Sequence, residues 1–471
     1  MTNSTRSQVS SFFPSIFVIA CSIFVISLAV SLSAQTLTKP PVASAPAATT
    51  KPDFGVWTRN SIQPPPAIEP VKLPPLATQP GDGDTEAIYR AAIGWFDKAV
   101  ANVDKLVPAA EAAADRIIAG GKVYAGGAPG FIQECFGRAG GLAGLAEWKG
   151  EYLDRNDVLI IGQLGPREEG ERSAAVSYIA RSDGHLSRSG LVIHVASHQW
   201  PGVARILGDG RERRWGGRLF LIDTLSPGGG SWADVSLDQM ATLATAWALQ
   251  GEIFAAVTRK GKTLATLESI CAPNNDKWNK PLWGKNINPA WTLPPVPAGK
   301  VARDYLLTCQ RRIVEFLESG EAKQVRLAGS RMAATMKRGG VVMTIIAGHV
   351  HVQGGVIPRS FRNMAMFGRD WEWHDARGVL KSGDMLYYMA YLDYPRRYVD
   401  DALAAGADAV TVAVGEGPTD ERRTHIRGHW AQWDSCVNIL DYPVRILPVS
   451  GVVQTPQWYS LIAEAEKALC K

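Results

Sequence analysis

The chain has 471 residues, of which 46% are hydrophobic and 20% charged, a composition typical of soluble globular proteins. This length exceeds what one ordinary hydrophobic core accommodates, so two globular domains plus tails are expected. The formal net charge of +5 is small for the length. Its one short basic cluster, residues 211–214, is typical of a solvated loop. The sequence therefore excludes an extended basic stripe and predicts no nucleic-acid partner.

The N-terminal residues 1–34 have the features of a targeting segment. Arg6 supplies a positive end, residues 12–30 are almost entirely apolar, and residues 31–34 offer small side chains for cleavage. The apolar run is long for a signal peptide and nearly long enough to span a bilayer, so an uncleaved anchor is an alternative. Either form predicts an exported protein, periplasmic or membrane-anchored outside the cytoplasm. This segment is its only expected membrane contact.

Residues 35–84 are rich in proline and contain eleven of the 29 prolines of the chain. Such a segment cannot bury enough apolar surface to fold, and proline favours an extended spacer. We interpret it as a disordered linker between the membrane and the folded domains.

The first domain is expected over residues 85–270. Apolar residues at helical spacing predict helices that begin near Asp84 and near Pro108. Short apolar runs predict buried parallel strands, and a long apolar segment closes the domain as a helix. The predicted strands are 123–125, 158–161, 191–196 and 219–222, and the closing helix is 237–259.

The second domain is expected over residues 301–471, after an interdomain linker, 271–300, that holds Pro, Asn and Trp without periodicity. The predicted helices and strands follow the order of the first domain. Helices are expected over 302–319, 322–337, 397–406 and 456–469, and strands over 341–346, 385–391, 409–414 and 437–440.

A pattern that occurs twice supports this division. A helical run is followed by a double glycine, an apolar strand and a glycine turn, and the next strand opens with an acidic turn. The double glycines are Gly120-Gly121 and Gly339-Gly340, and the acidic turns contain Asp157 and Asp384. Two similar modules predict a tandem α/β protein, whose ligands bind at the turns that follow the strands.

The run Glu134-Cys-Phe-Gly-Arg138-Ala-Gly-Gly-Leu142, after the first strand, resembles the sugar isomerase (SIS) domain family. The matching turn of the second domain reads Gly348-His349-Val350-His351, and residues 247–262 resemble the closing helix of that family. The resemblance covers most of residues 85–470 in pieces. It implies two flavodoxin-like (SIS-type) three-layer modules with parallel sheets, which bind phosphosugars near helix N-termini.

The chain departs from the family pattern where phosphate would bind. The first turn, Gly126-Gly127-Ala128-Pro129, has no hydroxyl group, and Val350 stands where the family has serine. The turns after the second strands also lack the Ser-x-Ser-Gly loop. Backbone N–H groups at Gly126, Gly127 and Gly348 are the anion-binding groups that this pattern leaves.

An aldose–ketose isomerase needs a base that moves a proton between adjacent carbons and an acid that serves the oxygens. The candidates are Glu252, Glu134, His349 and His351, whereas His194 lies inside a predicted strand and is expected to be a core residue.

Three further residues are candidate substrate-binding groups. Arg138 follows Glu134 by four residues on a predicted helix, so the alternative is an ion pair on the helix surface. Asp434 and Asn438 lie beside the short last strand of the prediction, and their alternative role is to cap turns.

Histidines could also bind a metal if separate pairs converged. His349 and His351 alternate at a strand end, and His425 and His429 are four residues apart. No acidic or cysteine ligand is clearly spaced with them, so the sequence predicts no metal and no cofactor. The six cysteines form no Cys-x-x-Cys pair, and their spacing allows one or two disulfides without requiring any.

Two functional hypotheses of different classes follow. The first is an exported tandem SIS-like protein that binds a sugar or sugar phosphate at the strand ends, near the interface of its modules. If catalytic, it is an aldose–ketose isomerase. The second is a non-catalytic sugar-binding or sensor protein that has lost the phosphate site. A zinc-dependent hydrolase is a lesser alternative, and the sequence leaves association into homo-oligomers open.

Overall fold

The structure of the protein is a computed structural model, in which the chain divides into two units, residues 1–58 and 59–471. All the residues that it describes belong to the second unit: 84–164, 190–208, 210, 215–228, 231–270, 272–273, 275–347, 364–367, 380–430 and 433–470. The targeting segment and nearly all of the proline-rich linker lie outside the described residues. So do the predicted site residues Gly348, His349 and His351.

The first half of the described chain forms one five-stranded parallel sheet. Its helices are α2 (Asp84–Ala101), η2 (Val103–Leu106), α3 (Val107–Ile118), α4 (Pro129–Cys135), α6 (Pro201–Gly208) and α8 (Trp232–Arg259). Its strands are β1 (Val123–Gly127), β2 (Leu145–Glu147), β3 (Val158–Gly162), β4 (Leu191–Ala196) and β5 (Leu219–Asp223). The strands pair in the order β2-β1-β3-β4-β5, and every pair is parallel.

The second half forms another five-stranded parallel sheet. Its helices are α9 (Asn275–Leu282), α10 (Lys300–Glu318), α11 (Glu321–Lys337), α13 (Arg396–Ala404) and α14 (Ser450–Leu469). The sheet contains β6 (Val342–Ala347), β7 (Met364–Phe367), β8 (Met385–Asp393), β9 (Asp408–Val414) and β10 (Arg423–Gly428), in the order β7-β6-β8-β9-β10. A small antiparallel pair, β11 (Ser435–Val437) and β12 (Ile446–Pro448), precedes α14.

The two sheets have the same topology. Counted along the chain, each runs second, first, third, fourth, fifth, which is the flavodoxin-like order. The prediction of two flavodoxin-like α/β modules with parallel sheets is therefore confirmed. The carboxyl ends of the strands, where ligands of such sheets usually bind, form one edge of each sheet.

Burial on both faces explains why these strands read as nearly continuous apolar runs. In β8, Met385, Tyr387 and Met389 join the large core shared with the helices, whereas Leu386 and Tyr388 pack in a separate core with α13. Successive side chains of a strand point to opposite faces, so both faces need apolar residues.

The two double glycines end equivalent helices, α3 and α11, in the same way. Gly120 and Gly339 adopt positive φ angles of 89° and 80°, a conformation that ends α3 and α11 at little cost only for glycine. The N–H groups of Gly121 and Gly340 then donate to carbonyls five residues back, at 3.0 Å in both cases. A Cβ atom at Gly121 would collide with the carbonyl of Asn156, in the turn before β3. A Cβ atom at Gly340 would collide with the carbonyl of Gly383, in the turn before β8.

The acidic turns also match atom for atom. One carboxylate oxygen of Asp157 accepts the N–H of Lys122, just before β1, at 2.9 Å, and the other accepts the N–H of Asp154, at 2.8 Å. The carboxylate of Asp384 accepts the equivalent N–H groups, those of Val341 just before β6 and of Lys381, at 2.9 and 3.0 Å. Each aspartate therefore ties the start of one strand to the start of its neighbour.

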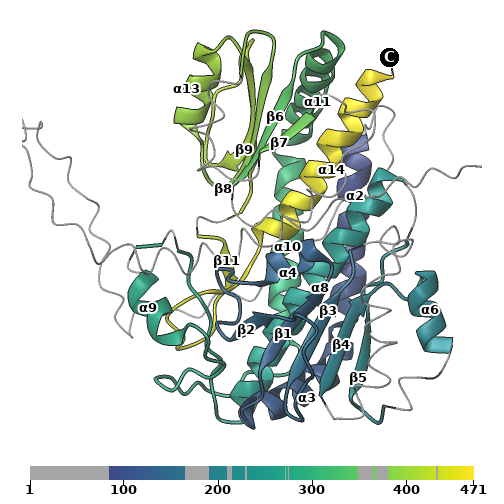
Figure 1. The fold of residues 1–471 in the computed structure, drawn as a ribbon, viewed down its shortest axis with the longest axis vertical. Helices are drawn as coiled ribbons and strands as arrows, with labels where there is room; N and C mark the ends of the chain where they lie inside the picture. Colours follow the sequence, from purple (N-terminus) through teal and green to yellow (C-terminus); the bar gives the residue numbers. More distant parts are fainter. Residues whose placement is uncertain are drawn as a thin grey trace, which may run out of the picture. The chain divides into compact units, whose positions relative to one another are not determined.

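Helices join the two modules. Helix α8 packs against α2, α3, α10 and α14, and α14 also packs against α11 and α2 (Figure 1). One continuous hydrophobic core consequently contains side chains from both sheets. Among the described helices, α8 alone is long and apolar enough to cross a membrane, and its apolar window is entirely buried within the protein.

Two helices begin earlier than the sequence predicted. Helix α8 begins at Trp232 because Ser231 and Asp234 form a reciprocal capping box ahead of it. Helix α14 begins at Ser450 and contains Pro456, at which the prediction had started the helix. Residues 450–465 of α14 are buried, so tertiary packing outweighs the local cost of proline.

Four strands, β2, β7, β10 and β12, were not predicted, and the last predicted strand, 437–440, corresponds to β11 at 435–437. The segment interpreted as an interdomain linker contains α9. In this segment Trp278 and Trp291 pack edge-on or tilted against each other and against Tyr442.

Candidate functional site

The predicted glycine turn after β1 is closely packed. A Cβ atom at Gly127 would collide with the carbonyl of Gly162 at the end of β3, and a Cβ atom at Gly162 would collide with the ring of Phe131. Phe131 is fully buried. Gly126 is buried as well, beside Leu159 and Trp148. The carboxyl ends of β1 and β3, where a ligand would meet this turn, are covered by a side chain of α4.

Glu134 and Arg138 form a buried pair rather than a surface pair. Their side chains are 0% and 1% exposed, and Arg138 Nη2 lies 3.4 Å from Glu134 Oε1. The same nitrogen lies 2.9 Å from Asp434 Oδ2 and donates to Ser450 Oγ at 2.7 Å. Arg138 thus holds two residues of the second module from a position in the first.

Asp434 binds the start of α14. Its Oδ1 accepts the backbone N–H groups of Val449 and Ser450, at 3.1 and 2.7 Å. A carboxylate at this place satisfies N–H groups that the first helical turn leaves unpaired. Arg138 and Asp434 together therefore fix the N-terminus of α14 against the turn that follows α4.

Burial raises the pKa of Glu134 to about 8; Arg138 acts in the opposite direction and Asp434 adds to the increase. Glu134 is therefore mostly protonated at neutral pH, which leaves one positive and one negative charge in the buried group. Neither carboxyl oxygen has a hydrogen-bond partner among the described residues. A side chain at Gly451 would collide with this carboxyl group, so the backbone of α14 lies directly against it.

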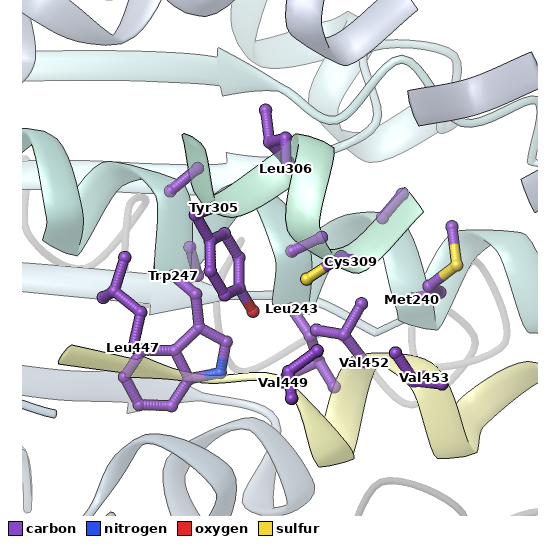
Figure 2. Close-up of a cluster of buried hydrophobic side chains, with 14 of the residues drawn as sticks. Met240, Leu243, Trp247, Tyr305, Leu306, Cys309, Leu447, Val449, Val452 and Val453 are labelled. Carbon is purple, nitrogen blue, oxygen red and sulfur yellow. The ribbon is translucent and has the colours of Figure 1, made fainter. Parts of the chain in front are cut away.

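Apolar side chains from both modules surround this region. Figure 2 shows Trp247 of α8, Tyr305 of α10 and Leu447 grouped with Val449 and Val452 at the start of α14. The Tyr305 hydroxyl donates to the carbonyl of Pro448 at 2.8 Å. The buried group of Glu134, Arg138 and Asp434 therefore lies in the packing between the two modules. Neither Glu134 nor Arg138 lines any of the three cavities described below.

Glu252 also has a structural role. Its carboxylate pairs with Arg259 at 2.9 Å and accepts the backbone N–H of Gly299, ahead of α10, at 2.8 Å. Arg259 in turn pairs with Glu111 of α3. Burial raises the pKa of Glu252, while its hydrogen bond to Arg259 acts in the opposite direction. The partners of Glu252 are thus separate from those of Glu134.

Asn438 is exposed, and its side-chain oxygen accepts from Arg445 Nε at 3.2 Å across the β11–β12 pair. It lies four residues from Asp434 but does not share its buried surroundings. Asp434 is the only one of the two that contacts Arg138 among the described hydrogen bonds and ion pairs.

The other histidines fit structural roles. His194 is buried on β4, and burial lowers its pKa to about 4. His425 lies on strand β10, where one ring nitrogen contacts Thr411 Oγ1 at 2.8 Å and the other the Gly415 carbonyl at 3.1 Å. His429 Nε2 contacts Ser319 Oγ at 3.2 Å. Within the described ranges no group of three or more His, Cys, Asp or Glu side chains could hold a metal ion.

The structure instead contains a cleft at the carboxyl ends of β4 and β5, which the sequence did not predict. Two adjoining cavities of about 770 and 180 Å³ share Trp95, Asp223 and Leu225. The larger is lined by polar groups of α2, of the turn after β4 and of the segment after β5. We call both together the carboxyl-edge cleft; polar groups along it are Arg90, Lys98, Lys105, His198, Gln199 and Ser226.

Asp223 ends β5 and organises this cleft. Its Oδ1 accepts the backbone N–H groups of His198 and Leu225, at 3.1 and 3.0 Å. Its Oδ2 lies 3.8 Å from Nδ1 of His198. The other ring nitrogen of His198, Nε2, has no hydrogen-bond partner among the described residues. The carboxylate therefore holds the ends of β4 and β5 in register and orients an imidazole beside the smaller cavity.

The segment after β5 is held by a chain of buried hydroxyl groups. Ser197 Oγ donates to the carbonyl of Ser226, and Ser226 Oγ lies 3.1 Å from Thr224 Oγ1. Asp238 of α8 accepts the N–H of Gly228 at 3.2 Å. Burial raises the pKa of Asp238 to about 6, with the hydrogen bonds from Ser226 and Gly228 acting against it. These contacts link one wall of the cleft to β4 and α8.

A third cavity, of about 310 Å³, lies beside β2. Apart from Lys122 it is lined by apolar side chains and glycines, among them Phe136 and Trp283. These two rings meet edge to face with centroids 6.5 Å apart. It offers fewer hydrogen-bonding side chains than the carboxyl-edge cleft and suits a polyhydroxylated ligand less well.

The sequence contained a signal for the carboxyl-edge cleft. A polar stretch, Asp223-Thr-Leu-Ser226, follows the apolar strand that was predicted over 219–222, and Ser197-His198-Gln199 follows the strand before it. Polar groups at the ends of two neighbouring parallel strands meet at one edge of the sheet.

No protein-family model and none of the curated proteins matches the chain. Among solved structures it is similar to the C-terminal domain of glucosamine-fructose-6-phosphate aminotransferase from Francisella tularensis, with 6% identity and a TM-score of 0.45. That match covers 81% of this chain and 96% of the other.

Another similar structure is tagatose-6-phosphate ketose/aldose isomerase from Escherichia coli, with 11% identity and a TM-score of 0.45, covering 82% of this chain and 93% of the other. Similarities with identities and TM-scores this low do not indicate an activity for this chain.

Proposed function

We propose that the protein binds a carbohydrate derivative, a sugar or sugar phosphate, in the carboxyl-edge cleft. The observation that carries this proposal is the cleft itself, about 770 Å³ beside about 180 Å³, at the strand ends where parallel α/β sheets usually bind ligands. Its side chains include carboxylate, imidazole, amide, hydroxyl and basic groups. Such groups can donate to and accept from sugar hydroxyls in fixed directions.

We propose no catalytic role for Glu134 or Glu252. Both carboxyl groups are buried: Glu134 lies beside Arg138, which joins the modules, and Glu252 is bound by Arg259 and by the N–H of Gly299. A base must come within hydrogen-bond reach of the proton that it removes, and neither group lines the carboxyl-edge cleft. This supports a sugar-binding or sensor protein over an isomerase built on those residues.

An aldose–ketose isomerase is the second candidate, and His198 favours it. Its ring lies beside the smaller cavity with Asp223 on the Nδ1 side. In that reaction Nε2 would take the C2 proton of an open-chain aldose, as the C–H electron pair forms the C1=C2 bond and the C=O electron pair moves onto O1. Transfer of the O2 proton to O1 and return of the first proton from Nε2 to C1 would then give the ketose. Exchange of the C2 proton into deuterated water, lost in His198→Asn, would support this candidate; binding without exchange would support the sensor.

We also propose the cellular setting and domain division that the sequence predicts. The targeting segment 1–34 and the linker 35–84 would export the chain and tether the domains, residues 85–270 and 301–471, outside the cytoplasm. The two modules of equal strand order support descent from a duplicated SIS-type domain.

Thermal unfolding of the full-length chain with sugars, sugar phosphates and amino sugars tests the proposed binding. A ligand that binds only the native state raises the melting temperature. We expect one class of probe to do so, Asp223→Asn to remove the shift, and Glu134→Gln to keep it relative to its own baseline. No shift with any probe, or a shift that only Glu134→Gln removes, would contradict the proposal.

A further inference from the structure

Two cysteines lie in elements that pack against each other. Cys309 is buried on α10, and Cys436 is half-buried in the middle of β11. Helix α10 packs against β11, although the whole second sheet, β6 to β10, lies between these two elements in the chain. Both thiols are free in the structure. The fold therefore brings two cysteines that are distant in sequence to one packing contact.

The face of α10 that carries Cys309 is the face that meets the β11–β12 pair. Tyr305 and Cys309 are four residues apart, so they share one side of the helix, and Figure 2 shows both on it. The Tyr305 hydroxyl donates to the carbonyl of Pro448 at 2.8 Å. Pro448 is the register partner of Ser435, the residue before Cys436. Cys309 accordingly lies one helical turn from a hydrogen bond to the partner strand of β11.

Strand β11 directs the Cys436 side chain away from the first module. Ser435 Oγ faces that module, since a Cβ atom at Gly140 would lie 2.7 Å from it. Successive side chains of a strand point to opposite faces, so Cys436 points away from Gly140. The loop of the first module therefore does not separate the Cys436 thiol from α10.

The electrostatic effects of the two thiols agree with this placement. Burial raises the pKa of Cys436, and the Cys309 thiol raises it further. Burial also raises the pKa of Tyr305, and both thiols add to the increase. Coulomb interactions weaken with distance, so these mutual effects indicate that the two thiols and the Tyr305 hydroxyl lie close together.

Burial also decides when the two thiols can react. It raises the pKa of Cys309 to about 12, with the hydrogen bond from Tyr305 acting in the opposite direction. The thiolate is the form that attacks a disulfide, and it is scarce at both positions in the folded chain at neutral pH. A bond between these cysteines therefore forms during folding, before α10 packs against β11, and is shielded from reductants afterwards.

We propose that Cys309 and Cys436 form a disulfide that ties α10 to β11. One cysteine thiolate attacks a disulfide of the oxidant and releases a thiol; the second attacks the resulting mixed disulfide, forms the Sγ–Sγ bond and releases the other thiol. The two cysteines lose two electrons and two protons, which the oxidant takes up as two thiols. The oxidant is a small or protein disulfide, and the proposed export would place the chain where such oxidants act.

The cross-link would hold the junction of the two modules. Asp434 lies two residues before Cys436, and its Oδ1 accepts the N–H groups of Val449 and Ser450 at the start of α14. Its Oδ2 pairs with Arg138 of the first module. Fixing β11 to α10 would therefore also fix the carboxylate on which this junction depends.

Peptide mapping of the full-length chain tests the disulfide directly. The chain is refolded from urea in a buffer of reduced and oxidised glutathione, alkylated with iodoacetamide in fresh urea, and digested. We expect the peptides of Cys309 and Cys436 to be recovered as one linked pair that a reductant separates. Recovery of both as alkylated thiols, or of either one linked to a different cysteine, would overturn the proposal.

Thermal unfolding measures the effect of the cross-link on stability. The closed loop contains the whole second sheet, and a long loop restricts the unfolded chain strongly. We expect the chain refolded with a reductant to melt about 5 °C below the oxidised chain. Cys309→Ala and Cys436→Ser should each abolish this difference, and Cys135→Ala, which removes a buried thiol of α4, should keep it. An undiminished difference in Cys436→Ser would contradict the assigned pair.

Hydrogen exchange tests the role of the cross-link at the junction. Exchange at the N–H groups of Val449 and Ser450 should be faster in the reduced chain than in the oxidised chain. The controls are the N–H groups of Lys122 and Val341, which aspartate carboxylates also hold but which lie away from β11. These should change less. Equal changes at all four positions would overturn the role at the junction, and the peptide map would still decide whether the disulfide exists.

Discussion

Glu134 illustrates how far a single residue can be interpreted from sequence. The four-residue spacing of Glu134 and Arg138 was visible, and an ion pair was one of the two expectations. The prediction that both lie on one helix is wrong, because α4 ends at Cys135 and Arg138 lies in the turn after it. Their burial was not visible, because the partners that bury them lie in the other module; Ser450 is 312 residues from Arg138. The buried setting converts a candidate catalytic acid into a proton-holding structural group.

This setting makes stability depend on pH. The pKa of Glu134 in the folded protein is about 8, above the ordinary value of 4.5. The contribution of Glu134 to the free energy of unfolding is therefore fully present below about pH 4.5 and is lost as the pH rises toward 8. The loss is about 1.4 kcal/mol per pH unit within that window. Glu134→Gln keeps the shape and cannot ionise. We expect urea denaturation to give equal stabilities for the two proteins at pH 4.5 and a more stable variant at pH 8.5.

Glu318→Gln, a replacement of the same kind at an exposed position, serves as the control. Parallel pH profiles for the wild type and Glu134→Gln would show that Glu134 ionises normally and that the buried assignment is wrong.

At the scale of elements, the sequence predicted the inner strands and the edge strand β5, but missed the edge strands β2, β7 and β10. Strands β1, β3, β4 and β8 are buried on both faces and therefore appear as apolar runs. Strand β10, with the sequence Arg-Thr-His-Ile-Arg-Gly, pairs only with β9 and carries polar residues typical of an edge. The cleft escaped prediction because it depends on which strand ends are left open, and Phe131 closes the end that the motif indicated.

Three glycines in helices or at their ends should respond differently to alanine. Gly94→Ala should stabilise by about 1 kcal/mol, because the space is open and the residue is helical. Gly339→Ala should destabilise by about 1 kcal/mol, because φ is positive although the space is open. Gly340→Ala should cost about 2–3 kcal/mol, because its Cβ would meet a backbone carbonyl.

Chemical denaturation of the three variants gives these values directly. The order of stability, with Gly94→Ala highest and Gly340→Ala lowest, is the expected result. A destabilising Gly94→Ala would mean that the glycine has a packing role that the open space beside it does not show.

At the scale of the whole molecule, the two modules share one core and one buried ion group. Removing Arg138 leaves Asp434 buried without its cation, a change that typically costs about 3–5 kcal/mol. Arg138→Met should therefore destabilise both modules together, in one transition seen by far-ultraviolet circular dichroism and by tryptophan fluorescence. Arg427→Met removes an exposed pair with Glu416 and should cost well under 1 kcal/mol.

Two separate transitions in Arg138→Met, with the first module unaffected, would instead mean that the modules fold independently and that the ion group is not what joins them.

A hydrogen-exchange footprint of the full-length chain, with and without a sugar phosphate that raises its melting temperature, locates the bound ligand without substitutions. The account predicts slower exchange at the backbone N–H groups of residues 223–228 and 197–199, and unchanged exchange in the turn at 126–138. Protection confined to residues 126–138 would contradict the carboxyl-edge cleft as the binding site.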